Sequence, residues 1–118
     1  MLLWAAFDDA KLRSSHREVI VDPRNEVFTS VASAWEIAIK SNAGALRFPF
    51  DRWDEIVSAM KWATVPILTR HAIEAGTLPL HHRDPFDRML IAQARLEGMK
   101  VVTVDRVFTL YDVPRFVG

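Results

Sequence analysis

Three acidic residues lie where an α/β sheet with parallel strands would bring them together. Asp105 directly follows the apolar stretch 100–104, which reads as a buried strand, and Glu36 falls in the first turn of a predicted helix. Asp87 falls in the first turn of the predicted helix that precedes the Asp105 strand. Because ligand sites of such sheets lie beyond the carboxyl ends of the strands, we expect the three carboxylates to share one rim.

Carboxylates that converge repel one another unless a cation lies between them. Glu36, Asp87 and Asp105 offer only oxygen ligands, which favours a hard cation, Mg²⁺ or Mn²⁺. A metal of this kind lowers the pKa of a bound water and neutralises charge that develops on a phosphate. The pattern therefore indicates hydrolysis of a phosphodiester.

Each acid also has a purely structural interpretation. Ser33 and Glu36 have the spacing of a capping box. The run Asp84-Pro85-Phe86-Asp87 fits an N-cap, a proline at the first helical position and an acid in the first turn, and Asp105 can cap a short helix. Helix capping explains each acid taken singly, but it does not predict that all three meet at one rim.

The elements that position these residues alternate between strand and helix. The predicted strands are 26–30, 65–68, 100–104 and 114–117, and the proline in 65–68 restricts that segment to a sheet edge or to the start of a strand. The predicted helices are a segment from Ser14 to Asp22, then 33–40, a helix after Pro49 capped by Asp51, a short helix 69–75, and 84–98. This alternation predicts an α/β domain with a mainly parallel sheet.

The composition is that of one small globular domain spanning residues 1–118, since half of the 118 residues are apolar and a quarter are charged. The chain has no cysteine, which excludes disulfides, thiolate zinc sites, iron–sulfur clusters and a cysteine nucleophile. Basic and acidic residues balance at 15 each, so a nucleic-acid partner would need a local patch.

The amino-terminal run Met1–Phe7 is apolar, but it lacks the basic region and the cleavage site of a signal peptide. No apolar stretch approaches the roughly 20 residues that span a bilayer. We therefore expect a cytoplasmic protein without a membrane partner.

Three stretches carry a resemblance to a known family: Val27–Lys40, His81–Ala94 and Val102–Asp105. In order and spacing they resemble PIN-domain proteins, and most closely the VapC-type toxin ribonucleases of bacterial toxin–antitoxin pairs. The resemblance implies a doubly wound, three-layer α/β/α fold and a Mg²⁺- or Mn²⁺-dependent endoribonuclease. It also implies a homodimer and a cognate antitoxin that blocks the site.

The resemblance assigns roles to individual residues by position. Glu36, Asp87 and Asp105 match the second, third and fourth acids of the family, and Thr103 matches a hydroxyl residue that supports the site. On this interpretation the three acids hold the metal. Thr103 positions the acids or the attacking water.

The beginning of the chain departs from the family pattern. Family members open with a buried strand ending in Asp-Thr-His, followed by a segment that resembles Leu2-Leu3-Trp4. We therefore expect the first central strand and its aspartate to be missing. One explanation is a misplaced start, in which a GUG valine codon of a longer chain is read as the initiator Met1 and the true start lies upstream. The other is a real truncation, which leaves a three-acid site and an exposed sheet centre.

Basic residues lie beside the acids in the sequence. Lys40, Arg83, Arg88 and Arg106 are candidate contacts to an RNA backbone, with surface ion pairs as the alternative and a pair with Glu36 the default for Lys40. Adjacent histidines in a loop cannot easily face one ion. We therefore interpret His81 and His82 as loop or substrate-contact residues.

The four tryptophans, Trp4, Trp35, Trp53 and Trp62, can stack on bases, but the positions of Trp35 and Trp53 favour packing in the core or in a dimer. The helices around Trp53 and Trp62 are a candidate groove for an antitoxin or a second subunit.

The function that these observations favour is a metal-dependent endoribonuclease toxin. One alternative is a catalytically impaired PIN-like module that binds an antitoxin or another partner without cutting. A further alternative is a DNA-directed nuclease, which the short chain disfavours.

Overall fold

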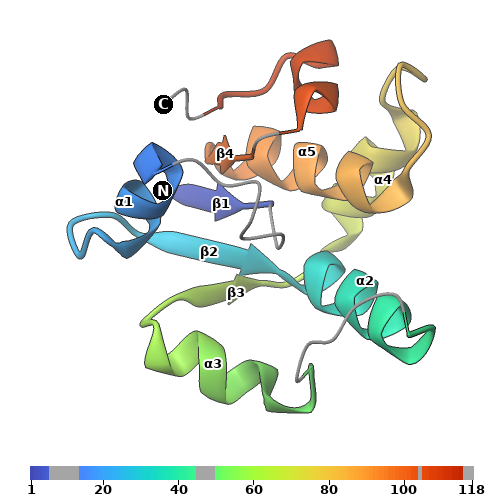
Figure 1. Ribbon diagram of the computed structural model, residues 1–118. Coiled ribbons are helices and arrows are strands. Elements are labelled where there is room, and N and C mark those ends of the chain that lie inside the picture. Colours follow the sequence, from blue (N-terminus) through green and yellow to red (C-terminus); the bar gives the residue numbers. More distant parts are fainter. Residues whose placement is uncertain (6–13, 45–49, 104, 116–118) are drawn as a thin grey trace.

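The computed structural model describes residues 1–5, 14–44, 50–103 and 105–115 (Figure 1). Within these residues the sheet has four strands in the order β3-β2-β1-β4. The strands are β1 (Leu2–Trp4), β2 (Val27–Ser30), β3 (Ala63–Val65) and β4 (Lys100–Val102). Every neighbouring pair is parallel, and Leu3 lies between Phe28 and Val101 in the register. The predicted parallel sheet is confirmed.

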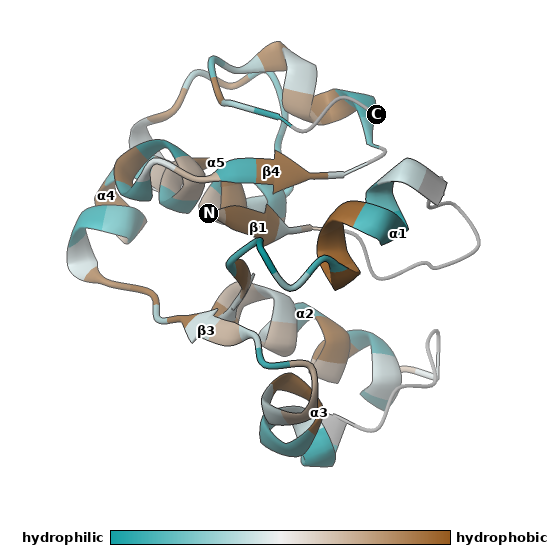
Figure 2. Ribbon diagram, turned by 90° about the vertical axis from the view of Figure 1, so that its left-hand side faces the viewer, coloured by the Kyte–Doolittle hydropathy of each residue, from teal (hydrophilic) through white to brown (hydrophobic). Residues whose placement is uncertain are grey.

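Helices cover both faces of this sheet. The described α-helices are α1 (Ser14–Val21), α2 (Val31–Asn42), α3 (Trp53–Ala59), α4 (Thr69–Thr77) and α5 (Pro85–Glu97), with 3-10 helices η2 (Phe50–Arg52) and η3 (Arg106–Leu110). Figure 2 shows α4 and α5 on one side of β1 and β4 and α1 on the other. The three-layer α/β/α arrangement is therefore confirmed. Within the described residues, none of the helices has the length and apolarity to span a membrane.

The alternation of side chains along each strand divides the core into two layers. Leu3 and Val101, both fully buried, pack in one cluster with Leu90 and Ile91 of α5. Their chain neighbours Leu2 and Val102 point to the opposite face and pack in a second cluster with Ile20 of α1. Strands that are apolar on both faces are typical of a parallel sheet covered by helices on both sides.

The expectation that the first central strand is missing is not confirmed. β1 lies in the middle of the sheet and is hydrogen-bonded on both sides: Leu2 N donates to Glu26 O at 2.8 Å, and Ala5 N donates to Val102 O at 3.0 Å. Leu2 and Leu3 are apolar and can be buried on both faces, so the segment after Met1 fills the central position itself. No acid stands at the end of β1, where the described segment ends in Trp4 and Ala5.

Several element boundaries differ from the predicted ones. The edge strand lies at 63–65 rather than 65–68, because Pro66 has no N–H to donate to a ladder. The helix predicted to stop at Gly76 continues to Thr77. In place of the predicted strand 114–117, the described residues contain one isolated bridge between Val101 and Arg115, and 116–118 lie outside them.

A buried histidine ties α4 to the end of α5. His71 is fully buried; its Nδ1 accepts the N–H of Leu68 at 3.0 Å, and its Nε2 lies 2.8 Å from Glu97 Oε1. Because Nδ1 accepts, Nε2 carries the proton and donates it to the carboxylate. Arg70 donates to the same oxygen. Hydrogen bonds from His71 and then from Arg70 hold the pKa of Glu97 below its ordinary value.

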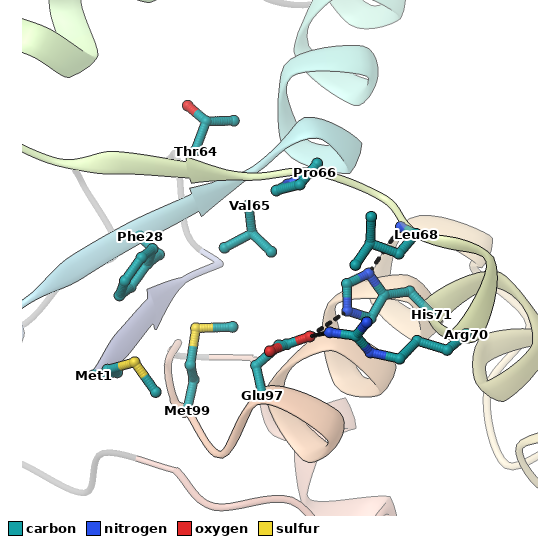
Figure 3. A pocket seen from close by; sticks show the side chains of 10 residues that line it. All are labelled: Met1, Phe28, Thr64, Val65, Pro66, Leu68, Arg70, His71, Glu97 and Met99. Atoms are coloured by element: carbon teal, nitrogen blue, oxygen red, sulfur yellow. Dashed lines mark hydrogen bonds and ion pairs between the residues drawn. The ribbon is translucent and has the colours of Figure 1, made fainter.

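This network borders a pocket of about 230 Å³ (Figure 3). Its lining is mainly apolar and includes Met1, Phe28, Val65 and Met99. Met1 and Met99 directly precede β1 and β4, so the pocket lies toward the amino ends of these strands.

The lowered pKa of Glu97 predicts a pH-dependent contribution to stability. The ionised carboxylate stabilises the fold above its ordinary pKa, near 4.5, and this contribution disappears as the pH falls through the lower folded-state pKa. Glu97→Gln should therefore cost about 1 kcal/mol at pH 7, and much less at about pH 3. Urea denaturation at the two pH values measures the difference.

Glu55→Gln is the control, because Glu55 pairs with Arg52 on the exposed surface of α3. It should change stability by less than about 0.5 kcal/mol at either pH. An equal loss for Glu97→Gln at both pH values would contradict the prediction.

Candidate functional site

The amino terminus of α5 places two aspartates at one rim of the sheet. Asp84 caps the helix: its Oδ1 accepts the N–H of Phe86 at 2.8 Å and that of Asp87 at 3.4 Å, with Pro85 at the first helical position. Asp87 follows in the first turn, and its side chain is only 19% exposed. The predicted helix start is confirmed. Capping accounts for Asp84, while the carboxylate of Asp87 faces the site.

Glu36 is not part of a capping box, so that interpretation is wrong. α2 begins at Val31, directly at the end of β2, and its N-cap is Ser30, three residues before the predicted cap Ser33. The hydroxyl of Ser30 accepts the N–H of Ala32 at 3.0 Å and donates to Gln93 Oε1 of α5 at 2.5 Å. Glu36 consequently lies in the second turn, where no free backbone N–H needs its carboxylate.

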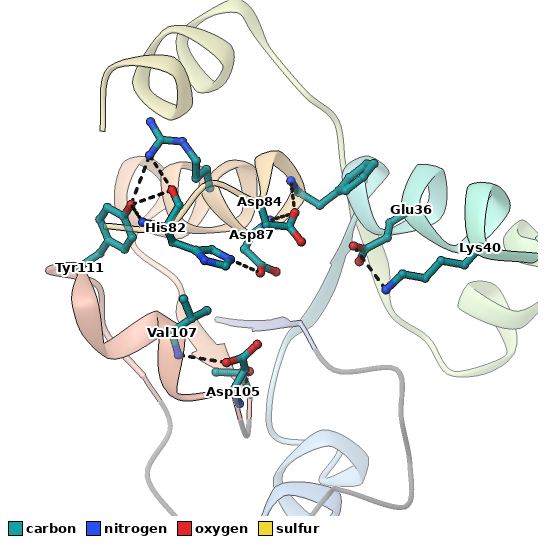
Figure 4. A network of polar contacts seen from close by, with 11 residues as sticks. Glu36, Lys40, His82, Asp84, Asp87, Asp105, Val107 and Tyr111 are labelled. Carbon is teal, nitrogen blue, oxygen red and sulfur yellow. Dashed lines mark hydrogen bonds and ion pairs between the residues drawn. The ribbon is translucent and has the colours of Figure 1, made fainter. Parts of the chain in front are cut away.

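The predicted pair between Glu36 and Lys40 is present. Lys40 Nζ lies 3.6 Å from Glu36 Oε2, one turn along α2. The lysine side chain is 55% exposed and the glutamate 20% exposed. Lys40 therefore offsets part of the charge of Glu36 and leaves the carboxylate directed toward the acids of α5 (Figure 4).

Asp105 begins η3 on the other side of the rim. Its Oδ1 accepts the N–H of Val107 at 3.0 Å, so helix capping holds for this acid. The hydroxyl of Thr103 accepts the N–H of Asp105 at 3.0 Å. Thr103 thus fixes the backbone from which the Asp105 side chain projects.

Electrostatic interaction links the acids of the three elements (Figure 4). Burial chiefly raises the pKa of Glu36, and the nearby charges of Asp84 and Asp87 raise it further, against the effect of Lys40. Burial also raises the pKa of Asp87, with smaller increases from Asp84 and Asp105 and an opposing hydrogen bond from His82. The structure therefore brings Glu36, Asp87 and Asp105 to one rim.

His82 is a residue of this site that the sequence reasoning missed. Its Nε2 lies 2.9 Å from Asp87 Oδ2, and one ligand atom each of His82, Asp84 and Asp87 lie within 4.8 Å of one another. The sequence argument was that two adjacent histidines cannot easily face one ion. It does not exclude His82, because this histidine alone of the pair faces the acids. The spacing His82-x-Asp84-x-x-Asp87 around a helix start was the available signal.

The donor set fits a divalent cation. The carboxylates of Asp84 and Asp87 lie close enough together to share a cation. Glu36 and Asp105 lie outside this close group, but both interact electrostatically with Asp87, and the combined negative charge would attract a cation. Oxygen ligands suit Mg²⁺ and Mn²⁺, and Nε2 of His82 is already engaged with Asp87 Oδ2.

Arg88 does not serve as a contact for an RNA backbone, contrary to expectation. It is 7% exposed, and its guanidinium donates to the carbonyl oxygens of Ala75 and Leu78, both at 2.8 Å. Its charge is directed into the protein because the loop before α5 folds over it. Arg83 and Arg106 are exposed, so their side chains reach solvent.

Trp35 does not pack in the core, which was one of its two predicted environments, because it is 60% exposed. Packing in a dimer, the other alternative, stays a prediction. Trp35 directly precedes Glu36 on α2. Its ring meets that of Phe86 edge to face, with centroids 5.0 Å apart.

Comparison with known families matches a single domain type to nearly the whole chain. The model of the PIN domain matches residues 1–114. No curated protein matches the sequence.

The raised pKa of Glu36 predicts that its charge destabilises the free protein. A carboxyl whose folded-state pKa is raised binds its proton more readily in the native state, so its ionisation at neutral pH disfavours folding, and the penalty vanishes as the pH falls. Glu36→Gln should raise Tm at pH 7 by roughly 2–4 °C, with a smaller gain near pH 4. Calorimetry without added metal measures both.

Glu18→Gln, at an exposed position of α1, is the control and should leave Tm within about 1 °C. A lower Tm for Glu36→Gln at pH 7 would show that its pair with Lys40 outweighs burial and repulsion.

Proposed function

Because this chain belongs to the PIN domain family, whose members are generally nucleases that use divalent metal ions, we propose that it is a metal-dependent endoribonuclease toxin. The observation that carries the proposal is the convergence of Glu36, Asp87 and Asp105 from three elements at one rim, with His82 and Asp84 beside them. In the free protein, burial and the neighbouring acids disfavour the charged forms of Glu36 and Asp87. A bound cation would offset this unfavourable charge.

We propose that Glu36, Asp87 and Asp105 hold Mg²⁺ or Mn²⁺, and that Asp84 completes the set of donors. When bound, the metal lowers the pKa of a bound water and offsets charge on the phosphate. Thr103 orients Asp105 through the backbone N–H of that residue. His82 orients Asp87 through its hydrogen bond to Oδ2.

Glu36 acts as a metal ligand in this proposal, so the proton of the attacking water passes to solvent. The water loses this proton as its oxygen bonds to phosphorus. The bond from phosphorus to the 3′ oxygen then breaks, and this oxygen takes up a proton from solvent. The products are a 5′-phosphate and a 3′-hydroxyl.

An unpaired RNA strand is the substrate that we favour. Trp35 presents an exposed ring next to Glu36 and is supported from the side by Phe86. Aromatic side chains recognise unstacked bases in single-stranded RNA. Arg83 and Arg106 are exposed beside the acids and are proposed to contact the phosphates, with Lys40 as a third cation.

We propose that the protein is a homodimer and is blocked by a cognate antitoxin. The predicted groove was around Trp53 and Trp62. A pocket of about 280 Å³ between the α1–β2 turn and the end of α3, lined in part by Ile20, Met60 and Trp62 but not by Trp53, supports the part of this proposal near Trp62. An apolar side chain of an antitoxin would fit this pocket. Trp62 itself packs edge to face on Trp4, with centroids 5.0 Å apart.

One observation favours a second candidate function, a PIN-like module that binds its partner without cutting. β1 ends at Trp4, and among the residues that the structure describes no acid directly after this strand joins the site. A module of this kind would bind metal weakly and show no metal-dependent turnover.

Asp87→Asn tests the nuclease assignment. The change keeps the shape of the side chain and removes its charge, so cleavage of a labelled single-stranded RNA with Mn²⁺ should fall at least about 100-fold. The Tm without metal should stay within a few degrees. Gel analysis with and without EDTA, beside an equivalent DNA strand, measures the loss and the preference between nucleic acids.

Asp51→Asn, an exposed acid of η2, is the matched control and should cleave at the wild-type rate. Equal cleavage by Asp87→Asn and wild type would refute the assignment of Asp87. Turnover of the DNA strand alone would favour the DNA-directed alternative, and wild-type protein without turnover would favour the non-cutting module.

Trp35→Ala tests the proposed base contact. Loss of one stacking interaction should raise KM for single-stranded RNA about 5- to 20-fold and change kcat little. Ile39→Ala, one turn away on the same exposed face of α2, is the matched control. If both changes raise KM equally, the face contributes general apolar contact and Trp35 has no stacking role.

A further inference from the structure

We propose that Arg88 and Tyr111 are positioning residues, which lock the loop 79–82 so that the His82 imidazole holds the Asp87 carboxylate in place for the metal. The inference rests on the proposed function. It assigns a role in the site to two buried side chains that lie behind it.

The guanidinium of Arg88 gathers the loop before α5 from inside. Besides Ala75 O and Leu78 O, it donates to Pro79 O at 3.0 Å and to His82 O at 3.2 Å. These carbonyl oxygens come from the end of α4 and from the loop that follows it. A buried cation thus satisfies four backbone acceptors that face away from water.

Tyr111, from a later part of the chain, is the second residue that holds the loop 79–82. Its hydroxyl donates to Pro79 O at 2.5 Å, accepts the N–H of His82 at 3.1 Å and accepts a hydrogen bond from Arg88 at 3.2 Å. The tyrosine is 8% exposed and belongs to the main core cluster. Its hydroxyl is therefore held in position by packing.

Both backbone polar groups of His82 are fixed in this way. Its N–H is bound by Tyr111 and its C=O by Arg88, while its imidazole Nε2 reaches Asp87 Oδ2 at 2.9 Å (Figure 4). Arg88 is the next residue after Asp87 on α5. One turn of helix therefore carries both the carboxylate and the group that positions its hydrogen-bond partner.

If Arg88 and Tyr111 only stabilised the loop, they would not need their hydrogen bonds to the backbone N–H and C=O of His82. Leu78, Pro79 and Ala75 are already bound by Arg88, which is enough to anchor the loop to α5. The additional bonds end on the one loop residue whose side chain enters the acidic site. Groups behind metal-binding carboxylates typically alter metal affinity about 10- to 100-fold when they are changed.

Tyr111→Phe is the decisive variant, because it keeps the buried ring and removes only the hydroxyl. At a temperature where the protein is fully folded, its affinity for Mn²⁺, measured by calorimetry without RNA, should be about 10-fold lower than in wild type. In a His82→Ala background the same substitution should cause no further loss. This non-additivity distinguishes action through His82 from a general effect on the fold.

Glu97→Gln is the control for lowered stability, since it disturbs α4 and α5 at the end away from the acids and should leave Mn²⁺ affinity unchanged. Arg88→Lys keeps the charge but loses the fork of donors, so it should weaken Mn²⁺ binding at least as much as Tyr111→Phe. If Arg88→Lys does not fold, Tyr111→Phe still decides the question.

Wild-type Mn²⁺ affinity in Tyr111→Phe, even with a lower Tm, would overturn the inference and leave the proposed nuclease standing. An equal loss with and without His82 would also overturn it. If wild-type protein neither binds Mn²⁺ nor cleaves RNA, the proposed function fails and the inference fails with it.

Discussion

The packing of α5 against the centre of the sheet is the interaction on which the rest of the molecule depends. Leu90, Ile91 and Ala94 are almost completely buried and belong to one cluster with Leu3 of the central strand β1 and Val101 of the neighbouring strand β4. This apolar contact fixes the orientation of α5 and its position along the strands. The amino terminus of the helix, with Asp84 and Asp87, is thereby carried to the rim where the chain leaves β2 and β4. Its partial positive charge also favours acidic side chains at that end.

The two ends of α5 use charge in opposite ways. At the carboxyl end, Glu97 is paired with His71 and Arg70, and its lowered pKa indicates a carboxylate that the fold stabilises. At the amino end, burial and neighbouring charges raise the pKa of Asp87. Stable pairing thus holds one end of the helix in place, while acids at the other end remain incompletely compensated. A cation-binding site needs negative charge that the protein does not fully compensate. The hydrophobic contacts of α5 offset the stability that this charge costs.

Much of this architecture follows from local patterns in the sequence. The start of α5 is marked by Asp84, whose side chain accepts backbone N–H groups, and by Pro85, whose φ is fixed. Its end is marked by Gly98, which adopts a left-handed conformation (φ 66°). Each of these effects acts within one turn of helix. The strand before α2, the parallel sheet and the edge position of the proline strand are also local or periodic features. The N-cap of α2 lies three residues before the predicted one because both Ser30 and Ser33 can cap the helix, and the hydrogen bond to Gln93 across the fold favours Ser30.

The sequence by itself determined which acids could meet, since strand–helix alternation places Glu36, Asp87 and Asp105 beyond the carboxyl ends of parallel strands. Only the tertiary structure decided what surrounds them. Leu2–Trp4 became the central strand through pairing with residues far along the chain. Arg88 turned inward to carbonyl oxygens, His82 joined the acids and Trp35 remained exposed. Each outcome depends on burial and on partners distant in sequence, and neither residue type nor spacing specifies these.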